Sequence, residues 1–208
     1  DSGIKAMGVA DYPAAEKYFR LALKEANGFP EDDARRDQAM RQLAQVLDRQ
    51  FKYMEAEVLY RQSLTRVERG KDQNNLAHGL TLFANHYRHR EKYDLAEPLY
   101  KQALAIREKV NGPKAWETAQ LMRDFADMNR DMGRADEAEA IYKQAITILE
   151  PIKDREYHLA FCLANLGELY LRQGKLDEAE ALCRQALVIY KRGKWAAMQF
   201  NLALCHGT

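Results

Sequence analysis

The sequence predicts an all-α protein built as an array of antiparallel helix pairs, and three observations support this prediction. A short segment recurs five times, with steps of 41, 40, 42 and 41 residues between equivalent positions. Each copy carries apolar residues spaced to lie on one face of a helix. Turn-forming residues separate the copies, so each period has room for two helices and a turn.

The recurring segment forms the second helix of each pair. It opens with an alanine, and four residues later comes an aromatic residue or, once, a cysteine; a small residue follows three positions further on. Small residues on an apolar helix face are expected where another helix comes close. The equivalent alanines are Ala15, Ala56, Ala96, Ala138 and Ala179, and the aromatic position holds Phe19, Tyr60, Tyr100, Tyr142 and Cys183.

A second apolar run lies upstream of each segment from the second copy onward and predicts the first helix of each pair. Its core positions are Leu43-Ala44, Phe83-Ala84, Phe125-Ala126 and Leu166-Gly167. Glycine and proline separate the pairs because neither continues a helix well. These breakers are Gly28, Pro30, Gly70, Gly112, Pro113, Pro151 and Gly193.

The predicted helices follow from these boundaries. They span residues 2–9, 13–27, 32–50, 54–69, 72–90, 94–110, 114–132, 136–150, 154–173, 177–192 and 195–206. We expect one domain over residues 1–208, with repeats at 1–29, 30–70, 71–112, 113–152 and 153–193. Residues 194–208 form a terminal helix or the start of a sixth repeat. Three second helices carry Asp-x-x-Glu at their start (Asp94/Glu97, Asp136/Glu139, Asp177/Glu180), which predicts capping boxes.

Composition limits the function classes. The chain of 208 residues has 32 Lys and Arg against 31 Asp and Glu, and both signs occur along its whole length. This balance argues against a nucleic-acid surface, and no apolar stretch approaches the ~20 residues of a membrane span. Three cysteines, Cys162, Cys183 and Cys205, lack C-x-x-C spacing and favour reduced thiols. We therefore expect a soluble, cytoplasmic chain.

No catalytic or cofactor motif occurs in the sequence. There is no phosphate loop, nucleophile elbow, zinc-protease signature or dinucleotide fingerprint. His86 and His89 are three residues apart, with His78 upstream, but no cysteine or carboxylate completes a metal-ligand set, and we expect surface or half-buried histidines. The prediction is a non-enzymatic protein without metal or cofactor.

The residues from Tyr93 to Val110, followed by Asn111-Gly112-Pro113, together with residues 160–190, resemble the tetratricopeptide repeat in the long-period form found in kinesin light chains. The resemblance implies a right-handed superhelical solenoid of helix pairs, whose first helices line a concave groove that binds peptides or protein segments. The family's Asn-Asn-Leu-Ala in the first helix is only partly kept, as Asn165-Leu166, so kinesin light chain cargo specificity is not carried over.

On that family's register, groove positions lie about two residues before and two, five and six residues after the core leucine of each first helix, and a further position lies one turn earlier. Together these positions hold six arginines and four carboxylates. The candidate peptide-binding residues are Gln38, Arg41, Gln45, Arg49, His78, Asn85, Arg88, Arg123, Asp127, Arg130, Glu168 and Arg172.

The favoured function is a non-catalytic scaffold that binds a peptide or protein segment, with an acidic or C-terminal carboxylate segment held across Arg41, Gln45, Arg49, Asn85, Arg88 and Arg123. Arginine forks match carboxylates, and Asn and Gln can bind peptide amides. In the alternative, these arginines are solvated or paired with Asp48, Asp127 and Asp131.

A second function class remains open. The repeat pattern is cut at both ends and the chain starts at Asp1, so it could be a regulatory, sensor or self-assembly module of a larger protein whose effector domain is absent. Self-association through exposed solenoid ends would use the apolar residues Trp195, Phe200, Leu202 and Leu204.

Overall fold

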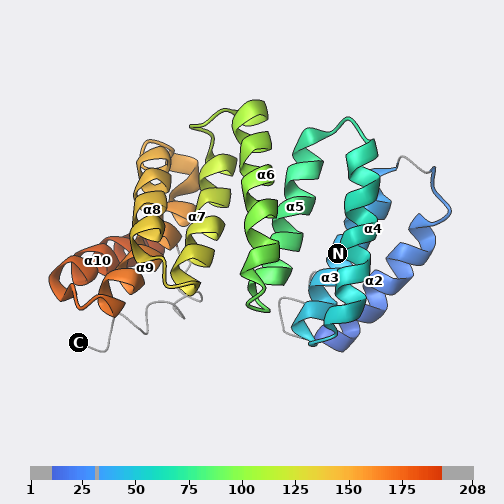
Figure 1. Ribbon diagram of the computed structural model, residues 1–208, viewed down its shortest axis with the longest axis horizontal. Coiled ribbons are helices and arrows are strands. Elements are labelled where there is room, and N and C mark those ends of the chain that lie inside the picture. The colour runs from blue at the N-terminus through green and yellow to red at the C-terminus, as the bar shows by residue number, and fades with distance from the viewer. Residues whose placement is uncertain (1–10, 31–32, 194–208) are drawn as a thin grey trace. The chain divides into compact units, whose positions relative to one another are not determined.

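The computed structural model describes residues 11–30 and 33–193. Within these ranges the chain forms nine α-helices, one short 3-10 helix and no β-strand (Figure 1). The helices are α2 (Tyr12–Ala26), α3 (Ala34–Arg49), α4 (Tyr53–Arg69), α5 (Gln73–Arg88), α6 (Tyr93–Asn111), α7 (Trp116–Asp131), α8 (Ala135–Leu149), η1 (Lys153–Arg155), α9 (Glu156–Arg172) and α10 (Leu176–Arg192). The α-helix bounds agree with the predicted ranges to within two residues, and the all-α class is confirmed.

The chain divides into two compact units, Asp1–Ile106 and Arg107–Thr208. In the first unit each helix from α2 to α5 packs on the next, and α3 also contacts α5. The second unit repeats this arrangement: α7 to α10 pack in order, and α7 also contacts α9. From α2 to α5, and again from α7 to α10, helices adjacent in sequence are therefore adjacent in space, as the period predicts. The single domain over residues 1–208 stays a prediction.

The recurring alanine lies on the buried face of each second helix. Ala15, Ala56, Ala96, Ala138 and Ala179 are all fully buried, with 0% of their surface exposed. The residue four positions later is buried as well in all five copies. The second helices thus bury the face that the sequence pattern predicts, because a methyl side chain lets the first helix approach.

The last pair shows how close this approach is. A Cβ atom added at Gly167 on α9 would lie 3.0 Å from Sγ of Cys183 on α10, so only glycine fits there without displacement. Cys183 takes the place of the tyrosine and is buried, as predicted. Cys162 is a free, buried thiol, and burial raises its pKa to about 12.

The turn inside each pair uses one backbone geometry four times. Phe51, Glu91, Gly133 and Gly174 occupy equivalent positions and have φ of 61°, 56°, 77° and 75°. In each turn the backbone N–H of the residue that follows donates a hydrogen bond of 2.9 Å to the carbonyl oxygen five residues before it. Lys52 N–H, for example, donates to the carbonyl of Leu47. This is the Schellman ending, in which a left-handed residue terminates the first helix. Glycine meets that requirement freely in the second unit, whereas Phe51 and Glu91 adopt it despite their side chains.

The predicted capping boxes at Asp136/Glu139 and Asp177/Glu180 are wrong. α8 begins after Arg134 and α10 after Lys175, and neither N-cap residue makes a side-chain capping bond. Glu139 instead accepts hydrogen bonds from Tyr170 Oη at 2.9 Å and Lys175 Nζ at 3.4 Å, across the interface with the next pair. This carboxylate therefore joins successive pairs rather than capping its own helix.

The same position joins pairs in the first unit. Glu16 accepts from Gln50 Nε2 at 2.9 Å and from Lys52 Nζ at 2.7 Å. Glu57 accepts from Tyr87 Oη at 3.0 Å and from Arg90 Nη1 at 3.1 Å. Each of these glutamates lies one residue after the recurring alanine, so the repeat carries both the packing contact and the polar contact between pairs.

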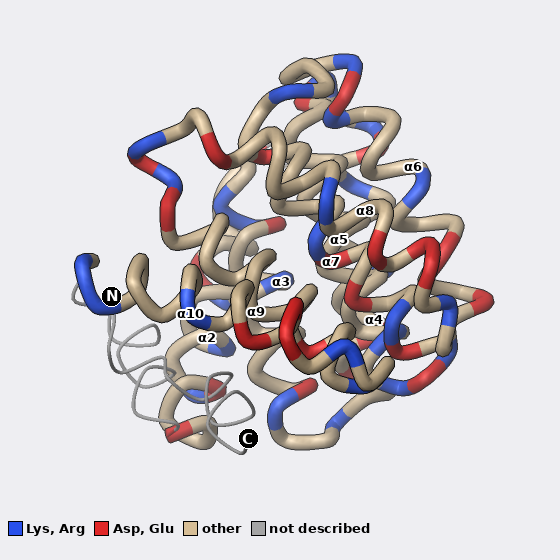
Figure 2. The backbone as a smooth tube through the Cα atoms, turned by 90° about the vertical axis from the view of Figure 1, so that its left-hand side faces the viewer, with Lys and Arg blue, Asp and Glu red and all other residues tan. Residues whose placement is uncertain are grey.

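Charges of both signs are interspersed along the helices of each unit (Figure 2). None of the helices in the described ranges has the length and hydrophobicity needed to cross a membrane. The helices predicted at 2–9 and 195–206 lie outside the described residues, as do the apolar residues Trp195, Phe200, Leu202 and Leu204.

Replacing Ala138 with Leu should lower the free energy of unfolding by about 1 to 3 kcal/mol, because the added atoms have no space between α8 and its neighbours. Ala140 lies on the exposed side of the same helix, and Ala140→Leu is the matched control. Urea unfolding followed by circular dichroism measures both. Equal stability of the two variants would contradict the helix register.

Glu57 should make the first unit sensitive to acid. Burial alone would raise the pKa of Glu57, but hydrogen bonds from Arg61, Tyr87 and Arg90 outweigh it and lower the pKa to about 2 from an ordinary 4.5. Because the folded state holds the carboxylate ionised, its stabilising contribution is complete above the unfolded pKa and is lost as pH falls from about 4.5 toward 2.

The free energy of unfolding should therefore fall less between about pH 6 and about pH 3 in Glu57→Gln than in the wild type. Glu68→Gln, an exposed site on the same helix, should behave like the wild type. Urea titrations at the two pH values give the comparison, and an identical acid loss in all three proteins would refute this role of Glu57.

Candidate peptide-binding surface

The predicted binding residues lie on the first helices of the pairs. In the first unit α3 contributes Gln38, Arg41, Gln45 and Arg49, and α5 contributes His78, Asn85 and Arg88. In the second unit α7 contributes Arg123, Asp127 and Arg130, and α9 contributes Glu168 and Arg172.

Exposure differs widely among the residues of the first unit. Gln38, Arg49 and His78 are exposed, whereas Gln45, Asn85 and Arg88 are half-buried. Asn85 is partly used by the fold, because its Oδ1 accepts a hydrogen bond from the Tyr100 hydroxyl. Arg49 forms no ion pair with any described residue. Gln38 and Arg49 are therefore the exposed polar groups that α3 contributes to this surface.

Arg41 differs from the other arginines of this surface because it is buried, with 7% of its surface exposed. Its guanidinium donates to Ser63 Oγ at 3.3 Å and to Asn75 Oδ1 at 2.8 Å, and both acceptors are neutral. Burial lowers the pKa of Arg41, although Asp37 and Asp72 act in the opposite direction from a distance. A buried cation with only neutral partners is costly unless an anion compensates it.

In the second unit Asp127 belongs to the fold rather than to a free surface. Its carboxylate accepts hydrogen bonds from the Tyr142 hydroxyl and from Asn165 Nδ2, the latter at 2.7 Å. Asp127 is buried, and burial together with this carboxylate raises the pKa of Tyr142 above its ordinary value. The predicted peptide-binding residue Asp127 is thus an internal acceptor that ties α7 to α8 and α9.

Arg130, Glu168 and Arg172 are brought together by the packing of α7 against α9. Arg130 donates to Glu168 at 3.1 Å and to Asp131 at 3.1 Å, and Arg172 donates to the other oxygen of Glu168 at 2.6 Å. Burial by itself would lower the pKa of Arg130, but Tyr142 and the carboxylates of Asp127 and Glu168 raise it. These charges compensate one another.

Arg123 is also paired within the second unit. It donates to Asp124 at 2.6 Å, and its guanidinium lies 5.4 Å from the centre of the Phe161 ring. Burial would lower the pKa of Arg123, and the adjacent carboxylate of Asp124 reverses this and raises it. The predicted arginines of the second unit therefore have carboxylate partners, whereas Arg41 and Arg49 of the first unit have none within the described residues.

His86 is fully buried, so the expectation of a surface or half-buried histidine is wrong for this residue. Its Nδ1 lies 2.7 Å from Asp48 Oδ1, and its Nε2 lies 3.3 Å from Arg90 Nη1. The rings of Tyr60 and Tyr87 lie 5.3 Å from it, centre to centre. The contacts make His86 a packed core residue, with Asp48 as an internal acceptor and not a groove ligand.

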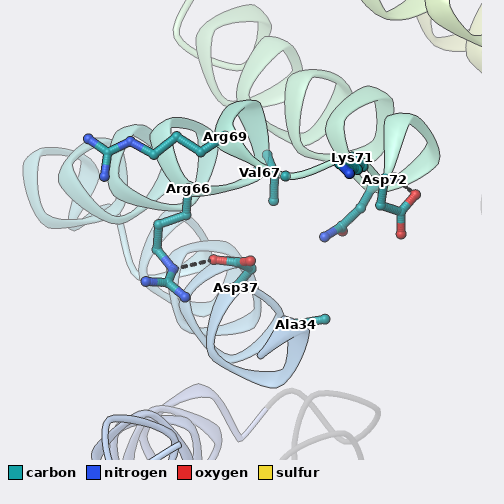
Figure 3. A pocket seen from close by; sticks show the side chains of 9 residues that line it. Ala34, Asp37, Arg66, Val67, Arg69, Lys71 and Asp72 are labelled. Atoms are coloured by element: carbon teal, nitrogen blue, oxygen red, sulfur yellow. Dashed lines mark hydrogen bonds and ion pairs between the residues drawn. The ribbon is translucent and has the colours of Figure 1, made fainter. Parts of the chain in front are cut away.

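A pocket of about 520 Å³ lies where α3 begins, α4 ends and α5 begins (Figure 3). This corner pocket is lined by Ala34, Asp37, Arg66, Val67, Arg69, Gly70, Lys71, Asp72 and Asn75. Arg66 reaches from α4 toward Asp37 and donates to it at 2.8 Å. None of these residues was among the sequence candidates, although Asn75 lies one helical turn before His78 and would have been found by extending the set by a turn.

The fold defines a helical-repeat protein built from antiparallel helix pairs. Profiles of the tetratricopeptide repeat match residues 75–150, and also residues 38–69 and 160–193, which together make up more than half of the chain. The chain belongs to the tetratricopeptide repeat family. A search of curated protein sequences found no match.

Solved structures of similar fold include kinesin light chain-like and peptide-binding repeat proteins. BtubC (BKLC) from P. vanneervenii has a TM-score of 0.76 at 20% identity, over 92% of this chain and 78% of that one. Nearly identical TPR-like repeats from Podosopora anserina, named after kinesin light chain, give 0.72 at 16% identity over 92% of each chain. Bacillus thuringiensis PlcR, solved with the peptide PapR7 and DNA, gives 0.79 at 16% identity, over 98% and 71%. At these identities the likeness establishes the fold.

Replacing Tyr142 with Phe should lower the free energy of unfolding by about 1 to 3 kcal/mol, because buried Asp127 loses one of its donors. Tyr18→Phe, at an exposed tyrosine of α2, should leave stability unchanged. Thermal and urea unfolding measure both. If Tyr142→Phe were as stable as the wild type, Asp127 would not depend on this hydroxyl, and its availability to a ligand would have to be reconsidered.

Proposed function

We propose that this chain is a non-catalytic scaffold that binds a peptide or protein segment on the first-helix surface of the first unit, and that the segment is acidic or carries a C-terminal carboxylate. The observation that carries the proposal is the contrast in charge pairing. Arg41 and Arg49 have no carboxylate partner in the described residues, whereas Arg123, Arg130 and Arg172 are paired.

The side chains around these arginines suit an extended segment. Gln38 and Arg49 are exposed on α3, and His78 is exposed on α5, which α3 contacts directly. Amide side chains such as Gln38 can donate to and accept from a peptide backbone, and arginine can bind a carboxylate with two hydrogen bonds. Membership of the tetratricopeptide repeat family supports a protein partner, and the peptide in the PlcR structure supports a peptide as ligand for this fold.

A random peptide library selected against the chain tests the proposal. Selection at ~50 and ~300 mM salt separates ionic ligands from apolar ones, because the Debye length shortens as salt is added. We expect acidic sequences that bind at the lower salt and are weakened at the higher. The absence of any selected peptide would overturn the proposed function.

Arg49→Glu should weaken the selected peptides by roughly threefold to tenfold, since it removes an attractive charge and adds a repulsive one. Arg49 is preferable to Arg41 for this test because reversing a buried charge would also destabilise the fold. Lys17→Glu, at an exposed position of α2, makes the same change in net charge away from the surface and should leave affinity unchanged. Equal weakening by both variants would indicate non-specific attraction and would remove the first-helix surface as the site.

A further inference from the structure

The corner pocket lies next to the one buried guanidinium of the first unit's binding surface. Asn75 belongs to both: it lines the pocket, and its Oδ1 accepts from Arg41 Nη2 at 2.8 Å. No carboxylate oxygen of the described residues lies within 4.0 Å of Arg41. Because Arg41 holds the oxygen of Asn75, the amide nitrogen of Asn75 is left to donate toward a ligand.

The second unit has an arginine at the position equivalent to Arg41, and this arginine, Arg123, is paired with a carboxylate. Arg41 and Arg123 both lie three residues before the small core residue of their helix, Ala44 and Ala126. The residue after Arg123 is Asp124, which accepts from it at 2.6 Å, whereas the residue after Arg41 is Gln42. The pKa values follow this difference: that of Arg41 is lowered by burial, and that of Arg123 is raised because Asp124 outweighs burial.

The second unit also fills the corner that is open in the first. Ala34 and Trp116 are equivalent as the first residues of α3 and α7, and Asn75 and His158 are equivalent as the third residues of α5 and α9. Trp116 stacks on His158 with ring centres 5.4 Å apart, and Arg155 lies 4.4 Å above the Trp116 ring. Aromatic packing therefore occupies the corner in one unit, while alanine and asparagine leave a pocket in the other.

The charges around the corner pocket leave an excess of positive charge. Arg66 is paired with Asp37, and Asp72 caps α5 by accepting from the N–H of Asn75 at 3.0 Å. Arg69 and Lys71 are exposed and form no ion pair with the described residues. Together with Arg41, which has no carboxylate of the described residues within ion-pair distance, they add positive charge at a pocket whose lining includes Val67 and Ala34.

We propose that the corner pocket binds the carboxylate of a peptide segment, from an acidic side chain or a C-terminus, with Asn75 as its hydrogen-bond donor and Arg41 as the buried countercharge. The proposal rests on the proposed function, since it supplies the anchoring point of the same ligand. A carboxylate fits better than a phosphate because Asp37 and Asp72 repel a doubly charged group more strongly. The apolar lining residues Val67 and Ala34 suit the methylene groups next to a carboxylate.

Two single substitutions place residues of the second unit at the equivalent positions of the first unit, and each should abolish carboxylate binding at the corner pocket. Ala34→Trp fills the corner as Trp116 does, and Gln42→Asp gives Arg41 the counter-ion that Asp124 gives Arg123. Ala140→Trp and Gln144→Asp place the same side chains on exposed positions of α8 and serve as matched controls. Circular dichroism and thermal unfolding establish that all four variants are folded.

The probes are acetylated tetraglutamate, acetylated tetraglutamine and inorganic phosphate, each titrated into the chain by isothermal calorimetry at low salt. We expect tetraglutamate to bind the wild type and both controls, and to bind Ala34→Trp and Gln42→Asp at least tenfold more weakly. Tetraglutamine keeps only its C-terminal carboxylate, so it should bind more weakly than tetraglutamate; binding as tight as that of tetraglutamate would assign the site to a C-terminus. Phosphate that bound as tightly as tetraglutamate and displaced it would overturn the assignment to a carboxylate.

The library peptides of the previous section separate this proposal from the proposed function. If a selected peptide bound Ala34→Trp and Gln42→Asp as tightly as the wild type, the corner pocket would be excluded as its anchor while the scaffold function stood. If tetraglutamate failed to bind the wild type, the pocket assignment would be wrong whatever the library gave. Loss of the selected peptide in both variants, with no loss in the controls, would support the site.

Discussion

The close approach of two helices at a fully buried alanine is the contact on which each repeat depends. The recurring alanines have no exposed surface, and at Gly167 the approach is so tight that an added Cβ would come within 3.0 Å of Cys183 Sγ. A larger residue at these positions would separate the helices and open the core. The alanine therefore fixes where the aromatic residue four positions later meets the neighbouring first helix, and all other contacts between the helices follow from that distance.

One consequence is that the fold itself uses polar positions on the first helices. In three of the second helices the recurring position is a buried tyrosine whose hydroxyl donates to a first-helix side chain: Tyr60 to Asp48, Tyr100 to Asn85 and Tyr142 to Asp127. A hydroxyl buried without a partner would cost stability, so these acceptors are needed by the core. A ligand can use only those first-helix polar groups that are not already hydrogen-bonded to the core. The set of such groups therefore differs from one repeat to the next.

This explains why the sequence predicts the helices well and the site only in part. Helix positions depend on the spacing of apolar residues and on turn residues, both of which are local, and the predicted bounds agree to within two residues. The use of each polar side chain depends on neighbours distant in sequence. Glu139 has the spacing of a capping box but bonds to Tyr170, 31 residues away. Arg41 has the register of an exposed groove residue but is buried, because Ser63 and Asn75 on the next two helices reach it.

The comparison of Arg41 with Arg123 shows how a repeat protein can vary a site without changing its fold. The two arginines share a register position, Arg41 buried and Arg123 half-buried, and they differ in whether the following residue is Gln42 or Asp124. Ala34 and Trp116 differ in the same way at the first position of their helices. None of these four positions is the buried alanine or the aromatic position that sets the distance between helices. Substitution there changes the charge and volume of a surface corner while the packing contact is kept, so one unit can close its corner and the other can leave it open to a partner.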